Sequence, residues 1–332
     1  MAFQVYPNII DQSLDPILAA VDIGTSNCRL LVARPDQLEF HVIDAFSRVV
    51  RLGEGVEETS VLSDSAIDRT VEALEVCAGK MSRNRVTCSR VVATEACRKA
   101  KNRDEFVDRV KSETGISIEV ITSQEEAELA FLGCSPLFDS RIANTMVFDI
   151  GGGSTELIWT GRRNDQAIQS VQSVSIPVGV INFKDKYGGD RFDNGIYEAM
   201  VASCISSFDK FLALDDIVNK IDLGIMELLG ASGTVTTLAA IHLGLKRYSR
   251  NRVDGVFLQF SDLKKITRAL SKMSFEERSN QVCIGRDRAD LMIPGCAILE
   301  AICCKFPIGS LRVADRGVRE GILFKLIQKL QG

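Results

Sequence analysis

Two stretches of the chain share one pattern of apolar and polar positions. Residues 19–33 (AAVDIGTSNCRLLVA) and 145–161 (TMVFDIGGGSTELIWTG) each contain an apolar run ending in Asp-Ile-Gly, a turn of small residues and a second apolar run. This pattern is typical of a buried strand, a tight turn and a returning antiparallel strand. Asp22 of the first copy matches Asp149 of the second. Two such hairpins roughly one domain length apart predict a duplicated fold.

The other apolar positions alternate between helical spacing and short continuous runs. Helices are expected near residues 63–82, 104–114, 194–212, 235–242 and 289–304, the last with a kink at Pro294. Short strands are expected at residues 90–94, 116–121, 225–229 and 310–314. A final helix from about residue 317 would bury Val318, Ile322, Leu326 and Leu330. The alternation predicts an α/β protein.

Small polar residues and a proline in residues 135–140 predict a junction between two domains. The first domain is expected to cover residues 1–138 and the second residues 139–316. The last helix, about residues 317–332, can pack back on the first domain. A chain of 332 residues is long enough for two domains that each have a core.

The composition is that of an ordinary globular protein, with 45% hydrophobic residues, 25% charged residues and a net charge of −4. Such a chain gives no global sign of a nucleic-acid or membrane partner, so a polyanion would need local positive charge. The ten cysteines contain no C-x-x-C pair and fit core positions in a reducing compartment. Without a secretory signal or an apolar run near the roughly 18 residues of a spanning helix, a cytoplasmic protein is expected. The oligomeric state stays open, a homodimer included.

The glycine turn of the second hairpin is a candidate anion site. Three glycines let successive backbone N–H groups approach a phosphate with no Cβ in the way. Asp149 and Glu156 bracket this turn, where they can hold a divalent cation. A plain hairpin with flexible glycines is the alternative, and the second copy of the pattern favours phosphate binding. Two such loops facing each other across an interdomain cleft would grip a phosphate chain or a nucleotide tail.

Two further segments carry candidate chemistry. Arg98 leads a basic cluster, with Lys99, Lys101 and Arg103, just past a predicted strand end, where open α/β sheets bind ligands. Its guanidinium can hold phosphate with two nitrogens, although a solvated helix start would look similar. Glu126 begins the next helix, where it can take a proton from an attacking water. A capping box formed by Ser123 and Glu126 is the structural alternative.

A third turn of small residues, Gly230-Ala231-Ser232-Gly233-Thr234, ends a predicted strand and opens a helix. The N-terminus of that helix is a ready anion or nucleotide site. Close packing of small residues is the alternative explanation.

Taken together, the motifs resemble the exopolyphosphatase and guanosine pentaphosphate phosphohydrolase family. The resemblance rests on AAVDIGTSNCRLLVA, ATEACRKAKN, ITSQEEAELAFLG, VFDIGGGSTELI, GASGT, IPGCAILEAI and LRVADRGVREGIL. These motifs run in the order of the family from residue 19 to residue 323. The resemblance implies a duplicated actin-like ATPase (ribonuclease H-like) fold of two domains with a cleft between them.

The resemblance also implies roles for individual residues. It makes Glu126 the catalytic base and places Mg²⁺, or Mn²⁺, at Asp149 and Glu156, with Asp22 as a further candidate ligand from the matching hairpin. The candidate phosphate-binding residues are Gly24, Thr25, Ser26, Asn27, Arg98, Gly151, Gly152, Gly153, Ser154, Ser232 and Gly233.

Two departures from the family pattern matter. Family members have Asn directly after the small residue of the first loop, whereas Ser26 separates Thr25 from Asn27 here. Which of Ser26 and Asn27 reaches phosphate therefore stays open. Longer members also carry a helical extension beyond the final helix, and this chain resembles the short two-domain form.

The expected function is hydrolysis of the terminal phosphate of inorganic polyphosphate, with water activated by Glu126 and with Mg²⁺. Hydrolysis of the 5′ phosphate of guanosine pentaphosphate is the close alternative, because the chemistry is the same. An ATP-dependent kinase on the same scaffold and a non-catalytic polyphosphate or nucleotide sensor are alternatives of other classes.

Overall fold

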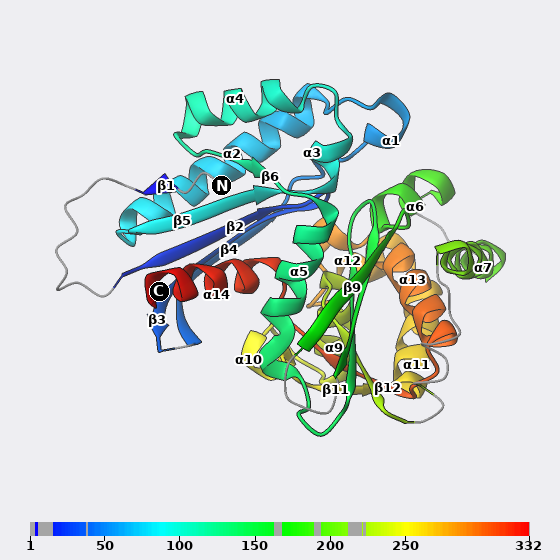
Figure 1. Cartoon of the computed structure of the whole chain (residues 1–332). Helices are drawn as coiled ribbons and strands as arrows, with labels where there is room; N and C mark the ends of the chain where they lie inside the picture. The colour runs from blue at the N-terminus through cyan, green and yellow to red at the C-terminus, as the bar shows by residue number, and fades with distance from the viewer. Residues whose placement is uncertain are drawn as a thin grey trace. The chain divides into compact units, whose positions relative to one another are not determined.

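The computed structural model describes residues 4–5, 16–37, 39–162, 168–188, 194–211, 221 and 224–331 (Figure 1). Contacts divide the chain into two compact units. The first comprises Met1–Gly133 and Gly317–Gly332, and the second comprises Cys134–Arg316. The last helix thus belongs to the unit formed by the first part of the chain.

The sheet of the first unit has the order β1-β5-β2-β3-β4, and β6 also pairs with β5. Its strands are β1 (Gln4–Val5), β2 (Leu18–Ile23), β3 (Asn27–Asp36), β4 (Glu39–Val49), β5 (Cys88–Ala93) and β6 (Glu119–Val120). Strands β2, β3 and β4 form an antiparallel meander, and β5 and β6 are parallel to β2. The central strand β2 is buried at almost every position, as expected where helices cover both faces of a sheet.

The helices of the first unit are α1 (Val56–Thr59), α2 (Asp64–Arg83), α3 (Glu95–Lys99), α4 (Arg103–Thr114), α5 (Ser123–Cys134) and α14 (Val318–Gln331). Figure 1 shows α2 and α4 on one face of this sheet and α14 on the other. Helix α2 begins where the Ser63 hydroxyl accepts a hydrogen bond from the N–H of Ala66, a capping contact that serves an otherwise unpaired donor. The face of α2 that carries Ile67, Val71 and Leu74 is buried in the core.

Helices α5 and α14 touch through their backbones. A Cβ on Gly321 of α14 would lie 2.0 Å from the carbonyl oxygen of Leu129, and a Cβ on Gly133 of α5 would lie 2.0 Å from that of Gly317. Only residues without a side chain permit so close an approach.

The sheet of the second unit has the order β11-β12-β10-β7-β8-β9. Its strands are β7 (Asn144–Ile150), β8 (Thr155–Arg162), β9 (Ile168–Ile176), β10 (Met226–Gly230), β11 (Phe257–Gln259) and β12 (Ser310–Val313). Strands β7, β8 and β9 form an antiparallel meander, β10 and β12 are parallel to β7, and β11 is antiparallel to β12. Both sheets therefore contain a meander followed by two parallel strands. This repetition confirms the predicted α/β fold of two domains with a duplicated design.

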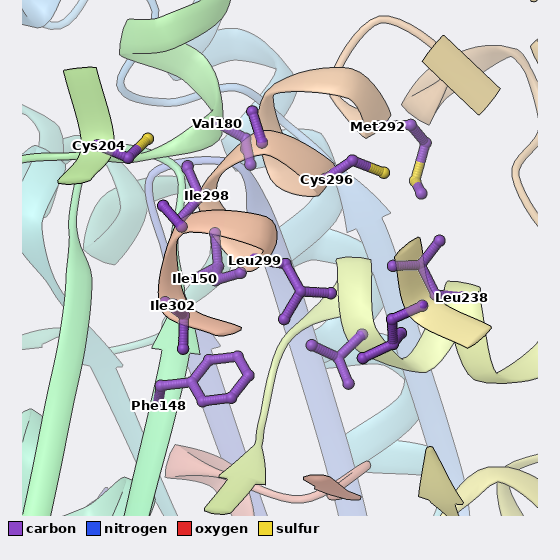
Figure 2. Packing of buried hydrophobic residues seen from close by; sticks show 14 of the residues in the cluster. Phe148, Ile150, Val180, Cys204, Leu238, Met292, Cys296, Ile298, Leu299 and Ile302 are labelled. Carbon is purple, nitrogen blue, oxygen red and sulfur yellow. The ribbon is translucent and has the colours of Figure 1, made fainter. Parts of the chain in front are cut away.

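The helices of the second unit are η1 (Ser135–Leu137), α6 (Val180–Tyr187), α7 (Asn194–Phe211), α9 (Gly233–His242), α10 (Arg250–Val253), α11 (Phe260–Ser271), α12 (Phe275–Ser279), η2 (Arg286–Arg288) and α13 (Met292–Lys305). Figure 2 shows Phe148 and Ile150 of β7 in one cluster with Cys296, Leu299 and Ile302 of α13. Complete burial of an apolar side chain of this size contributes roughly 1.5–3 kcal/mol. Cys296 occupies such a core position, as predicted, and six of the ten free cysteines are buried.

Three details differ from the sequence prediction. The helix expected from residue 289 begins at Met292, so Pro294 lies in the first turn, where its missing N–H costs no helical hydrogen bond. Leu330 is 52% exposed rather than part of the buried face of α14. The strand expected at residues 116–121 is reduced to two paired residues, Glu119–Val120. Within the described part of the chain, no helix combines the length and the apolar character that crossing a membrane requires.

Candidate functional site

The glycine turn of the second unit joins β7 to β8. The N–H of Gly151 donates to the carbonyl oxygen of Ser154 at 2.8 Å, which closes the turn. The flanking strands pair residue by residue from Ile150 and Thr155 outward. The predicted hairpin is thus present, with Gly151, Gly152, Gly153 and Ser154 in its turn.

Helix α6 begins beside this turn and binds its carbonyl groups. The carbonyl oxygens of residues 151–153 accept hydrogen bonds from the N–H of Val180 at 3.0 Å, the N–H of Ile181 at 2.7 Å and the side-chain amide of Asn182 at 2.8 Å, respectively. In a planar trans peptide the carbonyl and the following N–H point in opposite directions. The N–H groups of residues 152–154 therefore point away from α6, and no acceptor for them occurs among the described residues.

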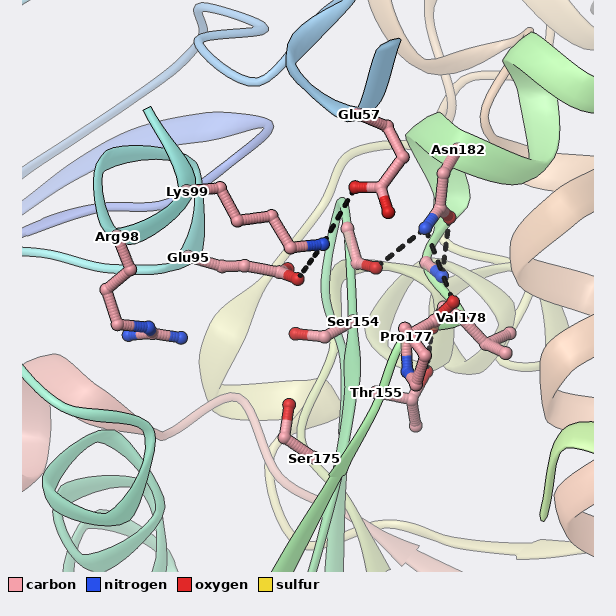
Figure 3. A network of polar contacts seen from close by, with 12 residues as sticks. Glu57, Glu95, Arg98, Lys99, Ser154, Thr155, Ser175, Pro177, Val178 and Asn182 are labelled. Atoms are coloured by element: carbon pink, nitrogen blue, oxygen red, sulfur yellow. Dashed lines mark hydrogen bonds and ion pairs between the residues drawn. The ribbon is translucent and has the colours of Figure 1, made fainter. Parts of the chain in front are cut away.

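The contact between α6 and the turn requires Gly179. A Cβ on this residue would lie 2.4 Å from the carbonyl oxygen of Gly152 and 2.5 Å from the nitrogen of Gly153. Asn182 also accepts a hydrogen bond from the N–H of Gly179 at 2.8 Å, and Figure 3 shows its amide between the two segments. Sequence reasoning missed Gly179 and Asn182. Their signal was a glycine at a helix start followed by asparagine three residues later, a capping pattern.

Asp149 and Glu156 lie directly opposite each other on β7 and β8, so both side chains project from the same face of the sheet. Glu156 is buried, at 5% exposure. Its Oε1 accepts hydrogen bonds from the hydroxyl groups of Ser154, at 2.5 Å, and Ser175, at 3.0 Å; Figure 3 shows both serines. Ser175 is a third residue that sequence reasoning missed, because it pairs with Glu156 only through the β8–β9 register.

These two carboxylates fit a hard divalent cation. Paired carboxylate oxygens beside an anion loop are the donors that Mg²⁺ uses when water and substrate phosphate supply its other ligands. No group of three or more His, Cys, Asp or Glu side chains with metal-binding geometry occurs among the described residues. Asp149 and Glu156 are a pair of neighbouring carboxylates, and their role as metal ligands stays a prediction.

The turn of the first hairpin repeats the same hydrogen bonds. The N–H of Gly24 donates to the carbonyl oxygen of Asn27 at 2.9 Å, as Gly151 does in the second hairpin. The carbonyl oxygen of Thr25 accepts a hydrogen bond from the N–H of Gly53. The carbonyl oxygen of Ser26 accepts hydrogen bonds from the N–H groups of residues 50 and 51. In both units, a segment that follows the meander donates hydrogen bonds to the carbonyl groups of the turn. The duplication therefore includes the hydrogen bonds that hold the two turns.

The first turn also offers side-chain atoms. The hydroxyl of Ser26 and the Oδ1 of Asn27 are buried and have no hydrogen-bond partner among the described residues. A Cβ on Gly53 would lie 2.2 Å from the methyl group of Thr25, so the close approach of residue 53 needs glycine. Ser26 and Asn27 therefore both remain candidates for phosphate contact.

Asp22 has a different environment from its counterpart Asp149. Arg29 lies opposite Asp22 on β3, where the second hairpin has Glu156. Burial raises the pKa of the Asp22 carboxyl, the positive charges of Arg29 and Arg319 oppose this rise, and Glu320 adds to it. Glu320 of α14 is itself fully buried. Asp22 therefore lies near two positive charges, Arg29 and Arg319, that oppose the effect of burial on its pKa.

Arg98 and Glu126 form an ion pair within the first unit. Nη1 of Arg98 on α3 lies 2.8 Å from Oε2 of Glu126 on α5, and it also donates to the carbonyl oxygen of Ile121 at 3.0 Å. The two side chains are 19% and 16% exposed. Lys99, from the same basic cluster, forms ion pairs with Glu57 and Glu95 (Figure 3).

The cap of α5 lies one residue before the capping box considered from the sequence. The hydroxyl of Thr122 accepts from the N–H of Glu125 at 3.1 Å, and its carbonyl oxygen accepts from the N–H of Glu126 at 3.0 Å. The Glu126 carboxylate is instead bound by Arg98.

The third predicted turn lies at the end of β10. The Ser232 hydroxyl accepts from the N–H of Val235 at 3.2 Å and so caps α9. A Cβ on Gly295 would lie 2.2 Å from the Thr234 hydroxyl, which shows close packing here. Ser232 and Gly233 are thus at a helix N-terminus, as predicted. The meeting of the two units' residues across a cleft stays a prediction.

Comparison with known proteins gives consistent results. The model of the Ppx/GppA phosphatase family matches residues 31–330. Exopolyphosphatase 2 of Mycobacterium tuberculosis is 28% identical over 325 residues, covering 93% of this chain and 98% of that protein. A putative exopolyphosphatase of Haemophilus influenzae is 28% identical and covers 95% and 92%. The guanosine-5′-triphosphate,3′-diphosphate pyrophosphatase of Aliivibrio fischeri is also 28% identical, and the match spans 96% of this chain but 61% of that protein.

Solved structures agree. A crystal structure of an exopolyphosphatase-like protein has a TM-score of 0.85 at 29% identity, covering 96% of this chain and 99% of that one. The Aquifex aeolicus family member has a TM-score of 0.75 at 27% identity, with coverage of 96% and 99%. The predicted enzyme class, a phosphoanhydride hydrolase, agrees with these relatives. The chain belongs to the Ppx/GppA phosphatase family.

Proposed function

We propose that this protein hydrolyses the terminal phosphoanhydride bond of inorganic polyphosphate. The observation that carries the proposal is the glycine turn, whose carbonyl groups are bound by α6 while the N–H groups of residues 152–154 point away from it. Fixed N–H donors stabilise an anion without reorganising when charge develops on it. A phosphoryl group, which carries charge on three oxygens, suits such a cradle.

Glu126 is the proposed general base. Water attacks the terminal phosphorus while the Glu126 carboxylate accepts a proton from it, the bridging P–O bond breaks, and orthophosphate and a shorter chain are released. Arg98 supports this role because one of its nitrogens binds Glu126. Its Nε and Nη2 have no partner among the described residues, and they are proposed to contact phosphate.

Asp149 and Glu156 are the proposed holders of Mg²⁺ or Mn²⁺. Bound there, the ion would offset negative charge on the substrate phosphates. The hydroxyl groups of Ser154 and Ser175 orient Glu156 for this task. Asp22 is the weaker candidate as a ligand, because Arg29 and Arg319 already supply positive charge near it.

The share of each relative's length that the chain matches supports polyphosphate, rather than guanosine pentaphosphate, as the substrate. The relatives that the chain matches over 92% and 98% of their length carry exopolyphosphatase names, whereas it matches 61% of the relative named for the guanosine nucleotide. The second candidate function remains hydrolysis of guanosine pentaphosphate, since both chemistries use the same groups.

The test measures phosphate release from long polyphosphate, short polyphosphate and guanosine pentaphosphate under equal conditions, with and without Mg²⁺. The proposal predicts the highest kcat/KM on polyphosphate and loss of turnover with a chelator. A higher kcat/KM on the guanosine nucleotide would overturn the substrate assignment. Phosphate transferred to an added acceptor would indicate a kinase, and Mg²⁺-dependent binding without release would indicate a sensor.

A further inference from the structure

A buried arginine that the proposed chemistry does not use lies next to the catalytic helix. Arg90 of β5 is 4% exposed. Its Nε and Nη2 donate to the two carboxylate oxygens of Glu119 on β6, at 3.0 and 2.9 Å. Nη2 also donates to Oε1 of Glu125 on α5, at 2.7 Å. One guanidinium thus joins the edge of the sheet to the first turn of α5.

The guanidinium of Arg90 is held firmly in place by these contacts. Two parallel N–H···O bonds to one carboxylate fix the plane of a guanidinium. Burial makes the loss of a partner costly, because an uncompensated charge would remain. Glu125 is therefore bound to a fixed point of the sheet rather than to a mobile surface side chain.

The neighbouring residue on α5 is Glu126, the proposed base. Adjacent residues of an α-helix project about 100° apart. Arg90 binds Glu125 and Arg98 binds Glu126, so two arginines from β5 and α3 hold two different sides of the same helical turn. These two anchors bind the turn from two directions, in addition to the backbone contact of α5 with α14.

We propose that Arg90 is a positioning residue for the reaction: through Glu125, it fixes the rotation of the first turn of α5 and so the direction of the Glu126 carboxylate. This inference rests on the proposed function, because it assumes that Glu126 is the base. Arg90 acts through another residue and does not contact substrate. A misplacement of a reacting group by 1 Å can cost about 10²-fold in rate.

The test uses two ways of breaking the contact, Arg90→Met and Glu125→Ala, each in the wild-type and in the Glu126→Gln background. In the wild-type background we expect each variant to lower kcat by about 10- to 10²-fold, with KM for polyphosphate changed less than about threefold. Combining Arg90→Met with Glu125→Ala should lower kcat no more than the more severe of the two single changes does. Both changes remove the same contact between Arg90 and Glu125. In the Glu126→Gln background neither change should lower the residual kcat further, since no base remains to be positioned.

The controls separate positioning from general damage. Arg109 on α4 also binds two carboxylates, Asp68 and Glu113. Neither partner lies on α5, so Arg109→Met should leave kcat unchanged. Glu125→Ala keeps the pair of Arg90 with Glu119 and serves if Arg90→Met does not fold. Arg90→Lys, which retains the charge but not the fork, should recover part of the kcat.

The outcomes are distinct. Wild-type kcat in Glu125→Ala, or equal fold losses in both backgrounds, would overturn the positioning role while leaving Glu126 as the base. Full turnover in Glu126→Gln alone would overturn the base assignment, and the positioning role would fall with it.

Discussion

One nitrogen of Arg98 binds the carboxylate of Glu126, at 2.8 Å. The other nitrogens of the same guanidinium have no partner among the described residues. A planar guanidinium that binds a carboxylate at one corner can bind phosphate oxygens at another. A phosphoryl group held in this way would lie within one side chain of the proposed base.

Glu126→Gln should lower kcat for phosphate release by about 10²- to 10⁴-fold, the range typical of a lost general base. Polyphosphate binding should survive, because the amide can still accept the hydrogen bond from Arg98. Single-turnover phosphate release and a direct binding titration measure the two effects. The matched control is Glu128→Gln on the same helix, which should leave kcat unchanged. The Glu128 carboxylate is exposed and accepts a hydrogen bond from the side chain of Gln124. Full release by Glu126→Gln would exclude this base.

Gly179→Ala should loosen the glycine turn. The added Cβ would lie 2.4 Å from the carbonyl oxygen of Gly152, and overpacking of this kind typically costs about 1–3 kcal/mol. We expect a lower free energy of unfolding and a raised KM for polyphosphate, because the displaced turn no longer presents its N–H groups together. Urea unfolding and steady-state kinetics measure these quantities.

Gly79→Ala is the control for that substitution. Gly79 lies inside α2, and nothing is within 4 Å of a Cβ built there. Alanine in a helix interior is favoured over glycine by about 1 kcal/mol, so this variant should be more stable and kinetically unchanged. An unchanged KM in Gly179→Ala would contradict the importance of the contact with α6.

Ser175→Ala should raise the Mg²⁺ concentration for half-maximal activity. Its hydroxyl donates a hydrogen bond to Oε1 of Glu156, as the hydroxyl of Ser154 also does. Loss of a group that orients a metal ligand typically costs about 10- to 100-fold in metal affinity. A Mg²⁺ titration of kcat measures the effect, with Ser112→Ala on the surface of α4 as the control. An unchanged midpoint would argue against Glu156 as a ligand.

Glu227→Gln should stabilise the protein at neutral pH. Burial raises the pKa of Glu227 above its usual 4.5, although hydrogen bonds from Thr145 and from the N–H of Asp139 lower it in part. A carboxyl with a raised pKa in the folded state costs stability as the pH rises through that pKa. The amide oxygen can keep both hydrogen bonds. The advantage of the variant in the free energy of unfolding should therefore be full above the raised pKa and vanish below about pH 4.5.

Asp44→Asn should have the opposite effect and lower the free energy of unfolding at neutral pH. Burial opposes the shift, yet hydrogen bonds from Lys80, Asn84 and the N–H of Ala45 lower the pKa of Asp44 below 3.8. Its charged form stabilises the fold above that value, so the asparagine variant should be less stable at pH 7. The difference should disappear as the pH falls through the lowered pKa. Urea unfolding between pH 3 and pH 8 tests both variants, and a Glu227→Gln advantage independent of pH would contradict the assignment.

Much of the fold follows from local pattern. The two hairpins were predictable because Asp22 and Asp149 occupy the same place in a repeated apolar pattern, and the strand pairing around them confirms the repeat. The start of α13 was not, because Pro294 is compatible both with a kink and with a first turn. Only packing of the preceding residues decides between these.

The site divides in the same way. Residues on one continuous motif, such as Gly151 to Glu156, could be named as candidates from the repeated pattern, and their roles stay predictions. Arg90 could not, because its partners lie 29 and 35 residues away and meet it only through the β5–β6 pairing and the start of α5. Nothing in the local sequence around Arg90 distinguishes it from a surface arginine.

The carbonyl groups held by α6 have a consequence for engineering this enzyme. The donors proposed to face the anion belong to the main chain, so among single substitutions at residues 152–154 only a change to proline would delete one of them. Libraries aimed at altered substrate affinity should instead vary the supports, Gly179 and Asn182, which set where those donors point. Selection for new substrates would accordingly act on the residues that support the turn rather than on the donors themselves.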